Sequence, residues 1–228
     1  MATLCGVLGF PVAHSRSPAI QNAAFRAAGL DWRYVKLPVR PELLAETVSA
    51  LPGSGYRGAN VTIPHKRAVV AVCDEAEGEA VNTLVFRDGR ILGFNTDKEA
   101  LAGIDAHRAC VIGAGGAALA LAPALPPDWR SYTRSGAWPP DAEGCDLIVN
   151  ATPVRDELLV QPHAGQVVVD LAYSIDDTKD TALVAAARAA GCQVVDGREA
   201  LVRQGAKAFE LWTGVQAPVD VMRAAVRI

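Results

Sequence analysis

The sequence predicts an α/β protein of two domains. Short β-rich runs alternate with helical segments along the 228 residues, a pattern typical of sheets that are mainly parallel. The alternation restarts beyond residue 100 with a strand, a glycine-rich turn and a helix rich in alanine and leucine. Half of the residues are hydrophobic, and a chain of this length buries roughly 70–75% of its unfolded surface, so the composition excludes a disordered chain.

The elements of the first half follow from apolar runs and from proline and glycine positions. Strands are expected at residues 4–8, 34–37 and 59–62, and helices at residues 18–28 and 41–51. Each helix opens with a proline at or near its first position, which suits the fixed φ of proline. Strands at residues 81–86 and 91–94 flank Asp88-Gly89, the turn signal of a hairpin.

The second half predicts strands separated by crossover helices. The strands are expected at residues 109–112, 147–150, 167–171 and 193–195, and residues 178–190 form a plausible crossover helix that ends before Gly191. The segment from Gln204 onward is helical and amphipathic. We therefore expect a first domain at residues 1–98, a second at residues 99–204, and a C-terminal helical segment at residues 205–228 that packs back on the first domain.

The composition excludes several classes of binding partner. The formal net charge of -3 provides no basic field for nucleic acid or anionic membrane. The first fifteen residues lack the pattern of a signal peptide, and the uncharged stretch at residues 109–127 is interrupted by glycines and prolines, so we expect no membrane span. The five scattered cysteines and four histidines lack zinc-site spacing, and reduced cytoplasmic thiols are expected. A monomer and a homodimer both remain open.

A glycine-rich turn joins the strand at residues 109–112 to the following helix. Gly113 permits the tight turn, Gly115 lets a pyrophosphate approach the backbone, and the small residue Ala118 allows the helix to pack on the strand. The helix N-terminus then offers N–H groups to the phosphates. The alternative is a simple tight turn, but the strand before it and the helix after it favour a Rossmann-type dinucleotide site.

The segment that ends the second strand of this domain favours NADP. Residues 129–135 contain no carboxylate that could bind the ribose 2′-hydroxyl of NAD. Arg134 can hold a 2′-phosphate, with Thr133 and Ser135 adding hydroxyl donors. Arg130 is the alternative if the strand is one turn shorter, and solvated surface arginines are the other interpretation.

Polar residues at strand ends predict a second site in the first half. Residues 14–18 precede a helix, where Ser17 is either a ligand-binding residue or only a helix N-cap. Residues 58–66 end a strand with a lysine shortly after a proline, and further amides and hydroxyls flank the hairpin. Such groups suit a polyhydroxylated, carboxylated small molecule. Lys66 and Asp97 together could transfer a proton at an alcohol or ketone, although a single lysine or aspartate is more often a surface charge.

The motifs together resemble the shikimate dehydrogenase family, over nearly the whole chain and in the family's order. The segments that carry the resemblance are residues 9–22, 58–66, 80–84, 93–97, 113–117, 150–153, 170–173, 197–205 and 211–214. Several motifs in one order are far more specific than any one of them.

The resemblance implies an NADP-dependent enzyme that interconverts 3-dehydroshikimate and shikimate, a step toward chorismate and the aromatic amino acids. Lys66 and Asp97 would be the catalytic pair, with Lys66 as the proton donor. Ser15 and Ser17 would bind the substrate carboxylate, and the other substrate-binding residues would be Asn60, Thr62, Asn82, Tyr173 and Gln204. The cofactor residues would be Gly113, Ala114, Gly115, Gly116 and Ala117 at the pyrophosphate, Thr133, Arg134 and Ser135 at the 2′-phosphate, Leu171 and Gly197 near the nicotinamide, and Thr152.

This chain is a shortened relative of that pattern. A helix between Lys66 and Ala80 is clipped, and the prolines at residues 139–140 exclude the usual helix after Arg134. Because the second change affects the cofactor side, we expect a weakened affinity for NADP. The alternatives are a quinate or aminoshikimate dehydrogenase, or a non-catalytic ligand-binding relative whose cofactor site has decayed.

Overall fold

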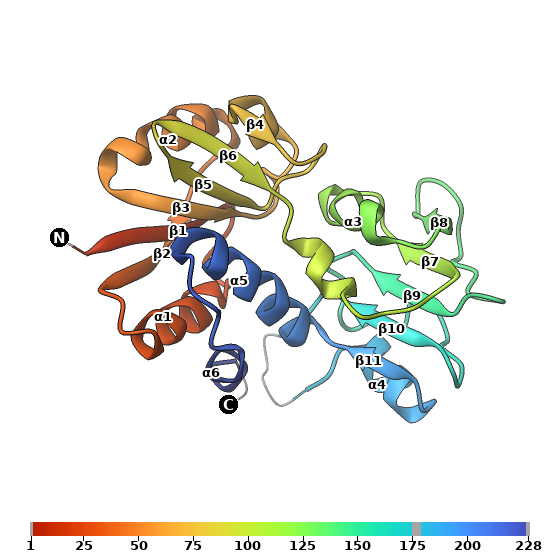
Figure 1. The fold of residues 1–228 in the computed structure, drawn as a ribbon. Coiled ribbons are helices and arrows are strands. Elements are labelled where there is room, and N and C mark those ends of the chain that lie inside the picture. Colours follow the sequence, from red (N-terminus) through yellow and green to blue (C-terminus); the bar gives the residue numbers. More distant parts are fainter. Residues whose placement is uncertain (1, 175–178, 227–228) are drawn as a thin grey trace. The chain divides into compact units, whose positions relative to one another are not determined.

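The structure is a computed structural model that describes residues 2–174 and 179–226. It consists of two compact units (Figure 1), Met1–Asp97 with Val202–Ile228, and Lys98–Leu201. Each unit contains one β-sheet with helices packed on it. The expected α/β fold class is therefore confirmed.

The first unit has a six-stranded mixed sheet in the order β2-β1-β3-β5-β6-β4. Its strands are β1 (Thr3–Gly9), β2 (Trp32–Pro38), β3 (Tyr56–Val61), β4 (Glu75–Ala76), β5 (Thr83–Arg87) and β6 (Arg90–Phe94). The β1–β2, β1–β3 and β4–β6 pairs are parallel, whereas β5 runs antiparallel to β3 and β6. The antiparallel part comes from the hairpin, whose turn residues Asp88 and Gly89 both have the positive φ that a two-residue hairpin turn requires. The short strand β4 was not expected from the sequence.

Alternation along the strands gives this sheet two different faces. Ala59 and Val61 point into an apolar cluster with Leu44 and Val48 of α2 (Leu44–Ala50). Helix α2 continues from the 3-10 turn η1 (Pro41–Leu43), so the single helix expected at residues 41–51 begins with a tighter turn. The opposite face is covered by α1 (Ser17–Ala27) and by the C-terminal helices.

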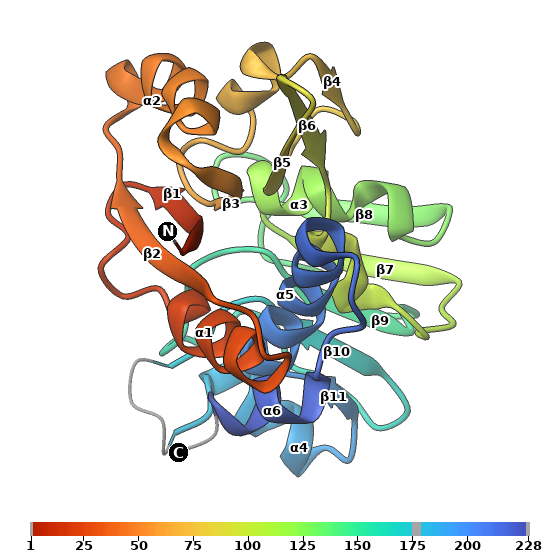
Figure 2. The same ribbon diagram turned by 60° about the vertical axis from the view of Figure 1, so that its left-hand side comes forward.

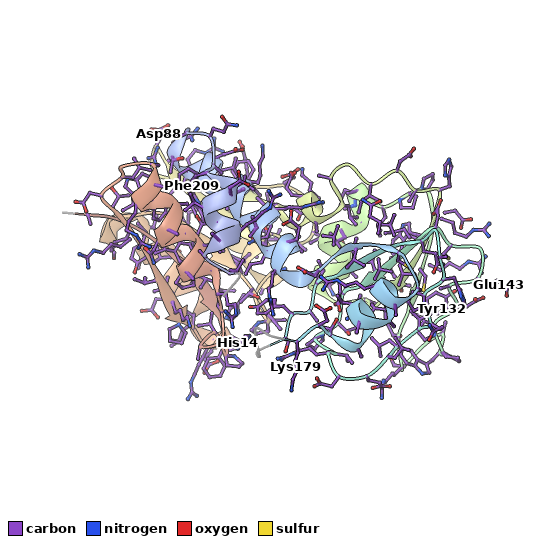
Figure 3. The ribbon with its side chains drawn as sticks, turned by 90° about the horizontal axis from the view of Figure 1, so that it is seen from below. His14, Asp88, Tyr132, Glu143, Lys179 and Phe209 are labelled. Carbon is purple, nitrogen blue, oxygen red and sulfur yellow. The ribbon has the colours of Figure 1, made fainter. Side chains whose placement is uncertain are left out.

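The C-terminal helices α5 (Gly197–Thr213) and α6 (Val219–Ala224) return to the first unit. Figures 1 and 2 show α6 beside α1. Phe209 of α5, labelled in Figure 3, stacks on Phe25 of α1 with ring centroids 5.6 Å apart, and the Trp212 indole N–H donates to the Leu84 carbonyl at 2.9 Å. The return of the C-terminal segment is confirmed, but α5 begins at Gly197, before the expected Gln204. Within the described residues, no helix is long and apolar enough to cross a membrane.

The second unit has a five-stranded parallel sheet in the order β11-β10-β9-β7-β8. Its strands are β7 (Arg108–Ile112), β8 (Asp128–Tyr132), β9 (Leu147–Asn150), β10 (Val167–Asp170) and β11 (Gln193–Val195). Alternate residues of the central strands pack against α3 (Gly116–Leu121) on one face and against α4 (Ala182–Ala189) on the other. Burial on both faces explains the continuous apolar runs in these strands.

Two features of this unit follow from breaks in the helical pattern. Helix α4 begins at Ala182 because Thr181 caps it by accepting from the Val184 N–H at 3.2 Å. The expected start at residue 178 lies outside the described residues. Residues 133–146 are all described and contain neither helix nor strand, in agreement with the interruption expected from the prolines.

Packing around Gly58 gives a test of the C-terminal return. A Cβ at this position would lie 2.4 Å from the Leu84 carbonyl oxygen and 2.2 Å from the Trp212 Nε1. Gly58→Ala should therefore separate α5 from the sheet and lower the free energy of unfolding by about 2–3 kcal/mol. Denaturant unfolding followed by circular dichroism measures this loss.

The matched control is Gly53→Ala in the same unit, where a Cβ would meet nothing within 4 Å. Its stability should stay within about 0.5 kcal/mol of the parent protein. Equal stabilities for the two variants would show that α5 does not press against β3.

Candidate active site

Lys66 and Asp97 form an ion pair at the end of the first unit's sheet. Lys66 lies in the loop after β3, and Asp97 begins the 3-10 helix η4 (Asp97–Leu101) after β6. The Lys66 Nζ lies 2.6 Å from the Asp97 Oδ2, and the two side chains are only 16% and 14% exposed. An ammonium group in this position can donate a proton to a substrate oxygen while the carboxylate holds it in place.

Asn82 orients the Asp97 carboxylate. Its Nδ2 donates to the Asp97 Oδ1 at 2.8 Å, so each carboxylate oxygen has a partner. The Asn82 Oδ1 in turn accepts from the Thr96 backbone N–H at 2.7 Å and from the Thr83 hydroxyl at 3.2 Å. This side chain is buried, and both its nitrogen and its oxygen are hydrogen-bonded, which fixes its own rotamer.

Asn60 lies on β3 opposite Thr83 of β5 and continues this network. Its Nδ2 donates to the Thr83 hydroxyl at 3.0 Å and to the Asn82 carbonyl at 3.2 Å, while its Oδ1 accepts from the Tyr34 hydroxyl at 2.6 Å. Both amide protons are therefore used within the protein. The Oδ1 retains a lone pair that can accept a hydroxyl group.

The two serines lie at the start of α1. The N-cap position is Arg16 and no side chain caps the helix, so the interpretation of Ser17 as an N-cap is wrong. The Ser15 hydroxyl donates to the Ser17 hydroxyl at 3.3 Å, and its oxygen accepts from the Ser17 backbone N–H, also at 3.3 Å. Ser15 therefore bonds to the first residue of α1, whereas the Ser17 hydroxyl can donate its proton to a carboxylate.

Side-chain hydrogen bonds join Tyr34 to the lysine without interruption. The connection runs from β2 to the loop after β3. In order it contains Tyr34, Asn60, Thr83, Asn82, Asp97 and Lys66.

Thr62, Gln204 and Tyr173 are the remaining expected substrate residues. Thr62 directly follows β3, and its backbone N–H donates to the Leu8 carbonyl at 2.8 Å. Gln204 lies on α5 next to Gly205, whose carbonyl accepts from the buried Gln21 side chain at 2.8 Å. Tyr173 belongs to the second unit, where it lines a shallow hollow with Gly197.

The glycine-rich turn of the second unit lies where the order of the sheet reverses. The chain proceeds from β7 to β8 on one side and then returns to β9 on the other side of β7. Gly113 has a φ of +110° and lies against Ala151 and Thr152, which follow β9. Nothing lies within 4 Å of the position that a Cβ of Gly115 would take. Open α/β sheets bind ligands at such a reversal.

Arg134 follows β8 and has two partners in this structure. Its guanidinium lies 5.3 Å from the centre of the Trp138 ring and donates to both carboxylate oxygens of Glu157, at 2.5 and 2.7 Å. Thr133 and Ser135 lie beside it with their hydroxyls 3.5 Å apart. Arg130, the alternative cation, lies inside β8 rather than beyond its end.

Asp170 secures the loops at the end of β10. Its Oδ1 accepts from the Asn150 Nδ2 and from the Ala172 N–H, both at 2.9 Å, and its Oδ2 accepts from the Thr181 hydroxyl at 2.5 Å. Leu171 follows directly, and a Cβ at Gly197 would lie 2.2 Å from the Ala172 carbonyl oxygen. Burial raises the pKa of Asp170 from its ordinary value near 3.8 to about 6, although these hydrogen bonds oppose the rise.

The second unit fits a dinucleotide. The open space at Gly115 leaves room for a pyrophosphate beside the first turn of α3, and no side chain caps that turn. Arg134 supplies a cation beyond β8, where an NAD site would have a carboxylate. Ala114, Gly116 and Ala117 complete the turn with small side chains or none.

Two residues of these networks, Tyr34 and Glu157, were not expected from the sequence. Tyr34 bonds to Asn60, and Glu157 pairs with Arg134. Thr83, which links Asn60 to Asn82, belongs to the polar residues expected beside the hairpin. A tyrosine inside a buried strand needs a hydrogen-bond partner, and this was the available signal for Tyr34. No local sequence pattern indicates a role for Glu157, which is 23 residues from Arg134 in sequence.

These features define an α/β oxidoreductase that combines a polar small-molecule site with a dinucleotide-binding unit. Residues 7–84 match the family model of the shikimate dehydrogenase substrate binding domain, and residues 197–227 match that of the shikimate 5′-dehydrogenase C-terminal domain. The chain belongs to the shikimate dehydrogenase family.

Individual relatives agree with this assignment. The NADP(+) shikimate dehydrogenase of Anaeromyxobacter sp. (strain Fw109-5) is 40% identical over 270 residues, which cover 98% of this chain and 95% of the relative. The alignment is longer than the 228 residues of this chain, so the relative contains internal segments that this chain lacks. The shikimate 5-dehydrogenase of Thermus thermophilus, solved with NADP(H) and shikimate, is 32% identical with a TM-score of 0.86, over 99% of this chain and 98% of that one. The quinate dehydrogenase of Corynebacterium glutamicum, solved with NAD, is 26% identical with a TM-score of 0.80, over 98% of each chain.

The raised pKa of Asp170 predicts a pH-dependent stability. Because the folded state binds this proton more tightly than the unfolded chain does, the contribution is full below about pH 4 and is lost as the pH rises through about 6. Asp170→Asn has nearly the same shape and does not titrate. Between pH 4 and pH 7 the parent protein should lose on the order of 2 kcal/mol of unfolding free energy relative to this variant, as measured by denaturant unfolding.

Two parallel stability profiles would contradict this prediction, because they would mean that Asp170 stays ionised in the folded protein down to pH 4. The comparison with the Asn variant removes the contributions of the other carboxylates, which titrate in both proteins.

Proposed function

We propose that this protein interconverts 3-dehydroshikimate and shikimate with NADP as the redox partner. The observation that carries the proposal is the Lys66–Asp97 pair, held by the buried side chains of Asn82, Thr83 and Asn60. The pair offers a proton donor to a carbonyl oxygen, and Ser15 and Ser17 at the start of α1 offer hydroxyls to a carboxylate. The names of the relatives, most of them NADP(+) shikimate dehydrogenases, support the same substrate and cofactor.

We propose roles for the first-unit residues from the family resemblance, supported by the hydrogen bonds of the Lys66–Asp97 pair. Ser15 and Ser17 bind the carboxylate, while Asn60, Thr62, Asn82 and Gln204, with Tyr173 of the second unit, bind the ring hydroxyls. Lys66 donates a proton to the ketone oxygen of 3-dehydroshikimate as the ketone is reduced. In the reverse direction it accepts the proton of the corresponding hydroxyl of shikimate. Asp97 holds the ammonium in place and is itself held by Asn82.

The second unit holds the cofactor in this proposal. When bound, the reduced cofactor NADPH would supply a hydride to 3-dehydroshikimate, and NADP+ would accept one from shikimate. The turn from Gly113 to Ala117 binds the pyrophosphate, Thr133, Arg134 and Ser135 bind the 2′-phosphate, and Leu171 and Gly197 lie near the nicotinamide. Thr152, which lies against Gly113, is a further cofactor residue. The five free thiols suit a reducing compartment, and a cytoplasmic location is part of the proposal.

A matrix of substrates and cofactors tests the function directly. Shikimate, quinate and an aminoshikimate are each assayed with NADP and with NAD, and kcat/KM is compared. The highest value should belong to shikimate with NADP. A preference for quinate would transfer the assignment to that substrate, and no turnover with any pair would support a ligand-binding protein without activity.

The ion pair predicts the consequence of removing the lysine. Lys66→Ala should lower kcat by about 10²–10⁴-fold, the usual contribution of a general acid or base, while shikimate still binds through the other polar groups. Absorbance of NADPH measures turnover, and calorimetry with shikimate measures binding.

Because the two residues act as a unit, adding Asp97→Asn to Lys66→Ala should lower kcat by less than about 3-fold more. If Lys66→Ala instead loses shikimate binding and keeps its turnover, Lys66 belongs to the substrate clamp and not to the proton transfer.

Arg134 predicts cofactor selectivity. A charge-assisted contact contributes on the order of 1.5–3 kcal/mol, so Arg134→Ala should bind NADP roughly 10–150-fold more weakly and leave NAD nearly unchanged. The arginine is 63% exposed and already pairs with Glu157, which favours the lower end of this range. Calorimetric titration with each cofactor measures both constants.

Glu157→Gln is the matched control, because it removes the competing charge without changing the shape, and it should bind NADP at least as tightly as the parent protein. Equal losses of NAD and NADP affinity in Arg134→Ala would indicate a role in the fold. No loss for either cofactor would move the assignment to Arg130.

A further inference from the structure

The second unit exposes a tryptophan beside the arginine proposed to bind the 2′-phosphate. Among the residues of this unit that the structure describes, the large hydrophobic side chains exposed to solvent are Trp138 and Leu158. The Trp138 ring packs on the Arg134 guanidinium, and Leu158 directly follows Glu157, the other partner of that guanidinium. Tryptophan is highly buried on average, so an indole that is 39% exposed at this place needs an explanation.

A tight turn holds Trp138 beside Arg134. The Thr133 N–H donates to the Ala137 carbonyl at 3.1 Å, and the Gly136 N–H donates to the Thr133 carbonyl at 3.0 Å, so the chain folds back on the end of β8. Gly136 has little room for a side chain, because a Cβ there would lie 2.9 Å from the Thr133 hydroxyl oxygen. The turn therefore returns the chain to Arg134, whose guanidinium lies 5.3 Å from the centre of the indole ring.

The covalent structure of NADP places an aromatic group next to its 2′-phosphate. This phosphate is attached to the 2′ carbon of a ribose, and adenine is attached to the neighbouring 1′ carbon of the same ribose. A cation that binds the phosphate therefore lies close to the adenine, whatever the conformation of the rest of the cofactor. An exposed indole in contact with that cation is the kind of surface on which a nucleobase stacks.

We propose that Trp138 is a cofactor-binding residue that stacks on the adenine of NADP, while Arg134 binds the adjacent 2′-phosphate. The inference rests on the proposed function. It assigns a residue to the adenine, which NAD and NADP share, beside the residue for the phosphate that distinguishes them. The segment at residues 133–146, which contains neither helix nor strand, thereby contributes to the affinity for the cofactor.

A role confined to holding Arg134 in place has a different consequence. A residue that acts only through Arg134 changes the affinity for NADP alone, because NAD has no 2′-phosphate for the arginine to bind. A residue that stacks on adenine changes the affinity for both cofactors. The affinity for NAD therefore separates the two roles of Trp138.

The first measurement is calorimetric titration of Trp138→Ala with NAD and with NADP, in the absence of substrate. NAD should bind roughly 5- to 20-fold more weakly, the lower part of the range for base–aromatic stacking, because this segment is open to solvent. NADP should lose at least as much affinity. Trp138→Phe keeps an aromatic ring and should recover most of the loss. The matched control is Leu43→Ala, which truncates an exposed hydrophobic residue of the first unit and should change neither affinity.

The second measurement is intrinsic fluorescence during titration with 2′,5′-ADP, a fragment of NADP that contains the adenine and the 2′-phosphate but no nicotinamide. Trp138 is one of four tryptophans in the chain, and adenine that stacks on it should quench its emission. The quenching should be present in the parent protein and absent in Trp138→Phe, although calorimetry should show that this variant still binds the fragment.

Unchanged NAD affinity in Trp138→Ala would overturn the inference, and so would equal quenching in the parent protein and Trp138→Phe. A loss confined to NADP would reject the adenine contact and assign Trp138 to the positioning of Arg134. If the parent protein binds neither cofactor nor the fragment, the proposed function fails first and this inference falls with it. A parent protein that binds them, with Trp138 variants that behave in the same way, rejects the inference alone.

Discussion

The carboxylate of Asp97 is the group on which the first unit's site depends. Removing two opposite charges from water costs several kcal/mol per ion, and their attraction offsets this cost only when the remaining hydrogen-bonding capacity is also used. Here the Oδ2 accepts from Lys66 and the Oδ1 accepts from Asn82. Asn82 is in turn held by the backbone of Thr96, next to Asp97 itself, so the pair is built into the end of the hairpin.

The polar connection crosses an otherwise apolar sheet because its residues lie on one face of that sheet. Asn60 and Thr83 are a paired position on β3 and β5, and they face away from the apolar cluster that includes Ala59 and Leu84. The C-terminal helix covers that polar face, with Trp212 donating to the Leu84 carbonyl. Packing of this helix has a free-energy cost at Gln21. The Gln21 Nε2 donates to the Gly205 carbonyl, but its Oε1 is buried without a hydrogen-bond partner.

Local signals made much of the fold predictable, and tertiary contacts account for what was missed. The hairpin at Asp88-Gly89 and the turn at Gly113 follow from short patterns, and polar runs at strand ends indicated most of the candidate site. The start of α5 at Gly197 was misplaced because its first turns are rich in charged residues, and tertiary packing, not periodicity, continues the helix through them. Tyr34 was missed because its hydroxyl has a meaning only once β2 lies beside β1 and α1, which no local pattern reports.

In the second unit, two contacts hold one arginine beyond the end of β8. Residues 133–146 form no helix, so the orientation of Arg134 depends on the Trp138 ring and on Glu157 rather than on helix packing. An exposed ion pair contributes at most about 1 kcal/mol, because solvent screens it. A phosphate carries more charge than the Glu157 carboxylate and presents three acceptor oxygens to the same planar guanidinium. Exchange of the carboxylate for a phosphate is therefore favourable on electrostatic grounds, and the Glu157 contact keeps the arginine beside the end of β8 without blocking its proposed role.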